Sequence, residues 1–162
     1  MKLKIKDQIP DTDIFQLVDG EPQKSKLREI IGDGKNVLFG LPGAFTSTCS
    51  KLHLPGFVAN ADKIKAKGIK NIFCLSVNDP YVMNGWGEIN NTGNSIKMLS
   101  DPYLLFTKAI GAEVDRNAKG MGIRSNRYLM VIENFTIVNI HVEKETKECG
   151  LTSAENLLNN LI

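Results

Sequence analysis

The chain has 162 residues, of which 42% are hydrophobic and 23% charged, and its 20 basic and 18 acidic side chains leave a formal net charge of +2. These values are typical of a globular chain, and we expect one domain over residues 1–162. The charge balance disfavours a dedicated nucleic-acid binder, and no apolar run approaches the ~20 residues of a membrane-spanning helix.

The first half of the chain predicts alternating strands and helices. Three apolar runs predict strands: Asp13–Val18, Asn36–Gly40 and Ile72–Val77. Between the first two we expect a short helix that Ser25 caps and Gly32 ends. A longer helical segment is expected from Thr46 onward, and Pro55-Gly56 must kink or break it. Because Ile72–Val77 is apolar throughout, it indicates a central strand covered on both faces.

The second half continues this alternation and then changes to an antiparallel pattern. Asp79-Pro80 and Asp101-Pro102 each resemble a helix N-cap with proline in the first turn, and Ile96–Leu99 lies between them as a short strand. Residues 111–125 are polar and contain glycine, which indicates a loop. A hairpin of two strands follows, Arg127–Ile132 and Thr136–Val142, with Val138, Ile140 and Val142 on one face.

A final helix is predicted from a capping box, Thr152-x-x-Glu155, with Leu157 and Leu161 facing inward. Parallel strand–helix units followed by an antiparallel pair are the layout of a thioredoxin-like fold. We therefore predict an α/β protein, a three-layer α/β/α sandwich with a mixed central sheet.

Three cysteines are present, and their odd number without a Cys-x-x-Cys pair argues against a secreted disulfide framework and a zinc ribbon. Met1–Lys6 does not resemble a signal peptide, so an intracellular protein is expected. Cys49 lies just beyond the strand Asn36–Gly40, where a helix begins. Backbone N–H groups and the helix dipole stabilise a thiolate at this position, although an inert buried thiol is an alternative.

The segment Pro42-Gly43-Ala44-Phe45-Thr46-Ser47-Thr48-Cys49 resembles the peroxiredoxin signature Pro-x-x-x-Thr-x-x-Cys. Its continuation to His53 and Gly56 is similar to the type-five (plant type-II) subfamily. Further similar blocks occur in the expected order: Asp7–Pro10, Leu75–Pro80 and Arg127–Val131. The resemblance therefore extends over almost the whole chain.

This resemblance implies a thiol-dependent peroxidase that reduces hydrogen peroxide and organic hydroperoxides. Such a site needs a deprotonated cysteine, donors for the developing negative oxygen, and a shield against water. By resemblance, Cys49 is the peroxidatic nucleophile and Thr46 orients the peroxide through its hydroxyl. Pro42 restricts access to the thiol, and Arg127 stabilises the thiolate and the transition-state oxygen. Without the resemblance, Arg127 would be interpreted as a solvent-facing charge at a strand end.

Other polar residues carry weaker indications. Arg124 competes with Arg127 less strongly, as a residue behind the site or on the surface. His53 follows Cys49 by one helical turn, and we favour a structural or reductant-contact role for it over a general base. His141 resembles an ordinary exposed strand residue. No Walker loop, Gly-x-Gly-x-x-Gly or clustered metal-ligand motif occurs, so we expect no nucleotide cofactor and no metal.

The sulfenic acid formed on Cys49 must be reduced by a second thiol. Cys74 lies in the most apolar strand and is expected to be inert core. Animal members of the subfamily carry their resolving cysteine directly after Gly-Leu-Thr, where this chain has Ser153. Cys149 does not occupy that position. We therefore expect a one-Cys cycle with glutathione and/or glutaredoxin as reductant, and keep internal resolution by Cys149 with thioredoxin as the alternative.

Two other classes stay open. A thiol–disulfide oxidoreductase is disfavoured because Thr46 stands where such enzymes carry the first cysteine of their dithiol. A non-catalytic thioredoxin-fold module would use Cys49 for redox sensing or binding. The resemblance also implies a homodimer and a location in the cytoplasm or, if a targeting extension was removed, in a mitochondrion or plastid.

Overall fold

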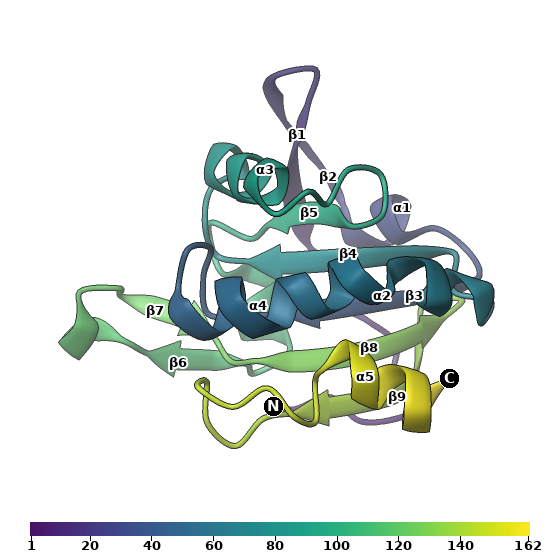
Figure 1. Cartoon of the computed structure of the whole chain (residues 1–162). Helices are drawn as coiled ribbons and strands as arrows, with labels where there is room; N and C mark the ends of the chain where they lie inside the picture. The colour runs from purple at the N-terminus through teal and green to yellow at the C-terminus, as the bar shows by residue number, and fades with distance from the viewer.

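In the computed structural model, seven strands form one mixed sheet in the order β2-β1-β5-β4-β3-β8-β9 (Figure 1). They are β1 (Asp13–Val18), β2 (Glu21–Lys26), β3 (Lys35–Gly40), β4 (Asn71–Ser76), β5 (Lys97–Ser100), β8 (Tyr128–Glu133) and β9 (Thr136–Val142). The central pairs β3–β4 and β4–β5 are parallel, and the outer pairs are antiparallel. The structure describes residues 1–162 except for the side chain of Leu161, so the inward direction predicted for that side chain lies outside the described part.

Helices cover both faces of this sheet. They are α1 (Leu27–Ile31), α2 (Leu54–Ala66), α3 (Pro80–Ile89), α4 (Leu105–Ala109) and α5 (Ala154–Asn156), which continues into a π-helical segment, Leu157–Leu161. Side chains of α2, α3 and α5 share one core cluster with one face of the sheet, and those of α1 and α4 share a second cluster with the other face. The predicted three-layer α/β/α sandwich with a mixed sheet is confirmed.

The strands that carry the predicted continuous apolar runs lie at the centre. Every residue of β3 after Lys35 is buried, and so is every residue of β4 after Asn71. Helix α3 begins as predicted, because the Asp79 carboxylate accepts a hydrogen bond from the Val82 N–H at 3.0 Å. The parallel strands β3 and β4 therefore deliver the segments that follow them to the same edge of the sheet, where Cys49 lies.

Two segments differ from the sequence predictions. Ser25 belongs to the edge strand β2 and does not cap a helix. The sequence did not predict this strand because it is almost wholly exposed and its polar residues show no apolar alternation. The predicted loop 111–125 contains a second, two-stranded sheet of β6 (Glu113–Asp115) and β7 (Ile123–Ser125) with a turn of 3-10 helix between the strands. Figure 1 shows this hairpin projecting beyond the central sheet.

Local hydrogen bonding shifts two further features by one residue. Ser153, not Thr152, caps α5, since its hydroxyl accepts a hydrogen bond from the Asn156 N–H at 3.1 Å. In β9 a bulge opposite Val131 and Ile132 leaves Val138 37% exposed. The sequence had placed Val138 on the same face as Ile140 and Val142. No helix in the described part of the chain is long and apolar enough to span a membrane.

Candidate active site

Cys49 is held by a loop that leaves β3 and turns into a helix. Phe45 adopts a left-handed conformation, with φ at 61°, just before the helix starts. The Asn78 side-chain oxygen accepts a hydrogen bond from the Ala44 N–H at 2.9 Å, and the Ser76 hydroxyl donates to the same oxygen at 2.8 Å. The ends of β3 and β4 thus fix the loop that precedes the thiol.

The first turn of this helix contains Cys49. The Thr46 carbonyl accepts a hydrogen bond from the Ser50 N–H at 2.9 Å, and the Thr46 hydroxyl donates to the Gly43 carbonyl at 2.8 Å. Thr46 therefore occupies the N-cap position, and its hydroxyl oxygen can still accept a hydrogen bond. The helix dipole places positive potential near the Cys49 sulfur.

Pro55 neither breaks the helix nor lets it continue as a regular α-helix. Residues Cys49–His53 form a π-helical segment in which the Leu54 N–H donates to the Cys49 carbonyl, and α2 follows without interruption. The wider turn accommodates the missing N–H of Pro55 and lets both Cys49 and His53 lie on the buried side. The predicted kink at Pro55-Gly56 thus takes the form of a π-bulge.

Arg127 enters the site from the residue before β8. Its Nη2 atom lies 3.3 Å from the Cys49 Sγ and donates to the Thr146 carbonyl at 2.8 Å. The side chain is 1% exposed, and among the described side chains no carboxylate forms an ion pair with it. A buried guanidinium that lacks a carboxylate partner favours a negative charge on the adjacent sulfur.

His53 holds the other end of the guanidinium. The Arg127 Nη1 donates to the His53 Nδ1 at 2.8 Å, and the opposite ring nitrogen, Nε2, lies 2.9 Å from the Thr152 carbonyl. Since arginine can only donate, Nδ1 is an acceptor and the proton sits on Nε2. Burial, followed by the charge of Arg127, lowers the pKa of His53 to about 3. The ring is therefore neutral and positions Arg127, with neither nitrogen left to act as a base.

A cavity of about 230 Å³ lies against the loop that leads into Cys49. It is lined by Pro42, Thr46, Ser47, Thr48, Arg116, Lys119, Met121, Arg127, Thr146 and Lys147. The structure thus brings three predicted site residues to one cavity, Pro42, Thr46 and Arg127. Arg127 links that cavity to the Cys49 sulfur. Four cavities are larger, and the two largest, of about 550 and 690 Å³, have wholly different linings, so size alone would not have identified this site.

Sequence reasoning missed the cavity residues that come from the β6–β7 hairpin and from the loop after β9. Arg116 and Lys119 lie in the segment predicted as loop, and Thr146 has no motif around it. Arg124, the weaker competitor of Arg127, donates from Nε to the Met121 carbonyl at 2.8 Å and lies against the active-site loop. The hairpin lies directly before Arg127 in the chain, and this position is the only sequence signal that it contributes to the site.

The other two cysteines have different surroundings. Cys74 is fully buried in β4, and this burial raises the pKa of its thiol well above the ordinary value. Cys149 is half-buried in the loop before α5, and burial raises the pKa of this thiol too. Within the described residues, no group of three or more His, Cys, Asp or Glu side chains could hold a metal ion.

Comparisons with known proteins establish the family of the chain. A family model described as Redoxin matches residues 4–158. Peroxiredoxin-2D of Arabidopsis thaliana is 38% identical over 160 residues, which cover 98% of each chain. The chain belongs to the peroxiredoxin family.

Two solved peroxiredoxin structures extend the match to three dimensions. Reduced Prx3 of Vibrio vulnificus in complex with hydrogen peroxide has a TM-score of 0.90 and 40% identity, with 96% of this chain and 97% of that chain covered. The antioxidant protein of Plasmodium falciparum, a 1-Cys peroxiredoxin, has a TM-score of 0.89 and 28% identity, with 96% of each chain covered. This peroxiredoxin has the thioredoxin-like fold and is a thiol peroxidase that uses peroxide substrates and a thiol reductant.

Proposed function

We propose that this peroxiredoxin reduces hydrogen peroxide and organic hydroperoxides through Cys49, with residues 1–162 acting as one domain. The Cys49 thiolate attacks one peroxide oxygen, the oxygen–oxygen bond breaks, and the second oxygen leaves as hydroxide or alkoxide and takes up a proton. The sulfur keeps the first oxygen as sulfenic acid. The single observation that carries this proposal is the 3.3 Å contact between the Arg127 Nη2 and the Cys49 Sγ.

The neighbours of Cys49 have distinct roles in this proposal. Arg127 stabilises the thiolate and the negative charge that develops on the leaving oxygen. Thr46, whose hydroxyl already donates to Gly43, accepts a hydrogen bond from the bound peroxide through its free lone pair. Pro42 is buried beside the cavity and limits the approach of water.

Single-cysteine variants test the nucleophile. We expect Cys49→Ser to abolish peroxide turnover because serine is a far weaker nucleophile at neutral pH. Cys74→Ser is the matched control, since its thiol lies inside the sheet, and most activity should remain. Turnover is measured by peroxide consumption with a thiol reductant in excess. Substantial turnover by the Cys49 variant would show that another group carries the chemistry.

For the second half of the cycle, we propose reduction by an external thiol, glutathione alone or with glutaredoxin. One thiol attacks the sulfenic sulfur and releases water, and a second thiol reduces the resulting mixed disulfide. Ser153 in place of a cysteine supports this one-Cys cycle, as does the likeness to a 1-Cys peroxiredoxin. The raised pKa of Cys149 lowers its thiolate fraction and disfavours internal resolution.

The alternative is an internal disulfide between Cys49 and Cys149, reduced by thioredoxin. The loop that carries Cys149 does cover the site, because its Thr146 carbonyl accepts from Arg127. We expect Cys149→Ser to turn over at a near-normal rate with glutathione and glutaredoxin. A Cys49–Cys149 disulfide found by mass spectrometry after treatment with peroxide would instead favour internal resolution.

We also propose a homodimer through a face beside the active site. Phe45 and Leu52 flank Cys49 in the chain, yet they are 58% and 61% exposed. Large apolar side chains at this exposure favour contact with another surface. Light scattering should give the mass of two chains for the wild type and one chain for Phe45→Asp. A monomeric wild type at micromolar concentration would contradict the proposal.

A further inference from the structure

A second cavity adjoins the active-site cavity and shares part of its wall. Its volume is about 430 Å³, and it lies between the β6–β7 hairpin and the loop that follows β9. Four residues line both cavities: Arg116, Lys119, Thr146 and Lys147. A molecule that occupies the second cavity could therefore extend into the site where Cys49 reacts.

The lining of this second cavity is cationic. Arg116, Lys119, Lys144 and Lys147 contribute positive charges, whereas Asp115 and Glu145 contribute negative ones. Glu145 pairs with Lys147 at 2.9 Å. The Asp115 carboxylate accepts a hydrogen bond from the Asn117 N–H at 2.7 Å, at the tip of the hairpin. The lining consequently has an excess of positive charge, although the whole chain carries a net charge of only +2.

Arg116 is a positioned cation in the wall that the two cavities share. Its backbone is fixed at the hairpin, where its N–H donates to the Gly122 carbonyl at 2.9 Å. Its Nη2 donates to the Thr146 hydroxyl, while its Nε is buried with no hydrogen-bond partner among the described atoms. Because Nε is closed off from the cavity, a ligand in the cavity can meet only the outer N–H groups of this guanidinium, on Nη1 and Nη2.

We propose that the second cavity binds a carboxylate group of the small molecule that reacts at Cys49. A carboxylate supplies the negative charge that the lysines attract, and its oxygens accept hydrogen bonds from the outer N–H groups of Arg116. Two reactants of a peroxiredoxin can carry this group, an acidic hydroperoxide and an acidic thiol such as glutathione. The thiol version rests on the proposed recycling by a small thiol, whereas the hydroperoxide version needs only the peroxidase activity of the family.

The test compares each acidic reactant with its neutral ester. Oxidation of Cys49 is followed with a hydroperoxy fatty acid and its methyl ester, and reduction of the sulfenic acid with glutathione and its diethyl ester. Each pair is measured by stopped flow in the wild type and in a Lys119→Gln/Lys144→Gln variant. The intrinsic reactivity of each probe is the same toward both proteins. A change in the acid-to-ester rate ratio between the wild type and the variant therefore measures the effect of the cavity lysines.

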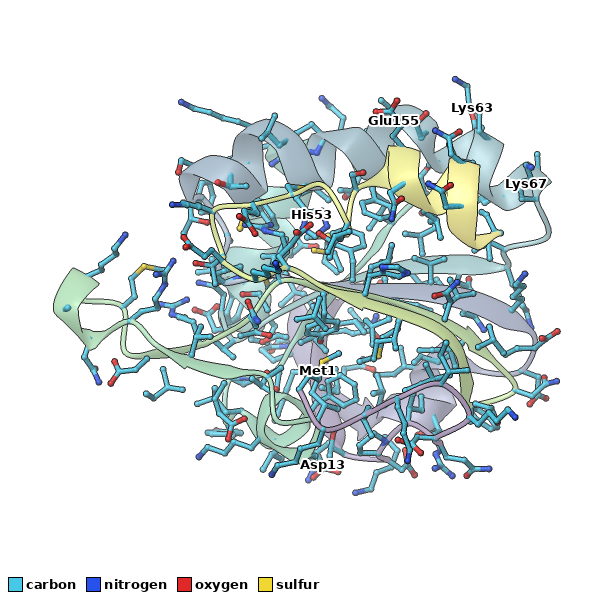
Figure 2. All side chains as sticks on the ribbon, turned by 90° about the horizontal axis from the view of Figure 1, so that it is seen from below. Met1, Asp13, His53, Lys63, Lys67 and Glu155 are labelled. Carbon is cyan, nitrogen blue, oxygen red and sulfur yellow. The ribbon has the colours of Figure 1, made fainter. Side chains whose placement is uncertain are left out.

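In the variant we expect this ratio to fall by roughly two- to tenfold at low ionic strength for at least one pair. The difference should shrink in ~1 M salt, where the Debye length is ~3 Å. The control is Lys63→Gln/Lys67→Gln, which removes the same charge from α2 and its C-cap residue. Figure 2 shows Lys63 and Lys67 pointing away from the body of the protein, at a distance from His53 and the active site.

The outcomes separate the two sources of the carboxylate. A lower ratio for the hydroperoxide pair alone assigns the cavity to the peroxide, and a lower ratio for the thiol pair alone assigns it to the reductant. Ratios unchanged in both pairs, or lowered equally by the control, would overturn the proposal. If neither thiol reduces the sulfenic acid, the proposed recycling by a small thiol fails. The carboxylate site is overturned in that case only if the acid-to-ester ratio of the hydroperoxide pair is also unchanged.

Discussion

Protonation of His53 should account for a defined part of the acid sensitivity of this peroxiredoxin. The ring is fully buried, its Nδ1 accepts from Arg127, and its Nε2 donates to the Thr152 carbonyl. Burial and the adjacent guanidinium lower the pKa of His53 from 6.5 to about 3. Between these two values the unfolded chain binds a proton on this histidine and the folded chain does not.

The sign and size of the effect follow from this difference. The contribution of a neutral His53 to the free energy of unfolding is fully present above pH 6.5 and is lost as the pH falls toward 3. One proton taken up by the unfolded state alone changes this free energy by about 1.4 kcal/mol per pH unit. A decrease from about pH 6.5 to about pH 4.5 should therefore cost roughly 2.5 kcal/mol through this group.

Urea unfolding followed by circular dichroism, at fixed protein concentration between about pH 4.5 and pH 7.5, measures this slope. His53→Asn keeps an acceptor for Arg127 but cannot bind the proton, so its stability should fall less steeply with acid than that of the wild type. His141→Asn removes the other histidine of the chain from strand β9 and should keep the wild-type slope. Parallel curves for the wild type and the His53 variant would refute a neutral, arginine-bound histidine.

Three further outcomes follow from particular contacts. Arg127→Lys keeps the charge but loses the planar fork, so stopped-flow oxidation of the thiol by hydrogen peroxide should slow by roughly 10- to 100-fold. Trp86 donates to the Ser50 hydroxyl at 3.1 Å, beside the reactive cysteine, and Ser50→Ala should reduce the fluorescence change on oxidation. A Cβ atom on Gly40 would lie 2.1 Å from the Tyr128 ring, so Gly40→Ala should lower the free energy of unfolding by about 3 kcal/mol or more, as measured in urea.

The elements that the sequence predicted well are those whose pattern is decided by burial. Strands β3 and β4 have continuous apolar sequences because helices cover both faces of the sheet there, and the start of α3 follows from Asp79 and Pro80 alone. Strand β2 is mostly exposed, and strands β6 and β7 have only 3 residues each, so none of them leaves a hydrophobic period in the sequence. The capping residue of α5 was displaced because Thr152 bonds to Glu143 instead.

The site could be anticipated only as far as its motif reaches. Cys49 and Thr46 lie in one short segment, whereas the contact to Arg127 joins residues 78 positions apart and was expected from family resemblance alone. The role of His53 depends on its two ring contacts, of which one is to a backbone carbonyl. Backbone acceptors carry no residue signature, so no sequence pattern could have identified this contact.

Thr146 also makes its contact through a backbone carbonyl that no sequence pattern identifies, and it connects the site to the neighbouring cavity. Its carbonyl accepts from Arg127, and its hydroxyl accepts from Arg116, so one residue of an irregular loop bridges the guanidinium at the thiol and the guanidinium at the cationic wall. In the proposed mechanism, a ligand bound to Arg116 is separated from Arg127 only by Thr146. If both proposals hold, substrate selection and thiol activation depend on the same short loop after β9, which the peroxiredoxin motif does not include.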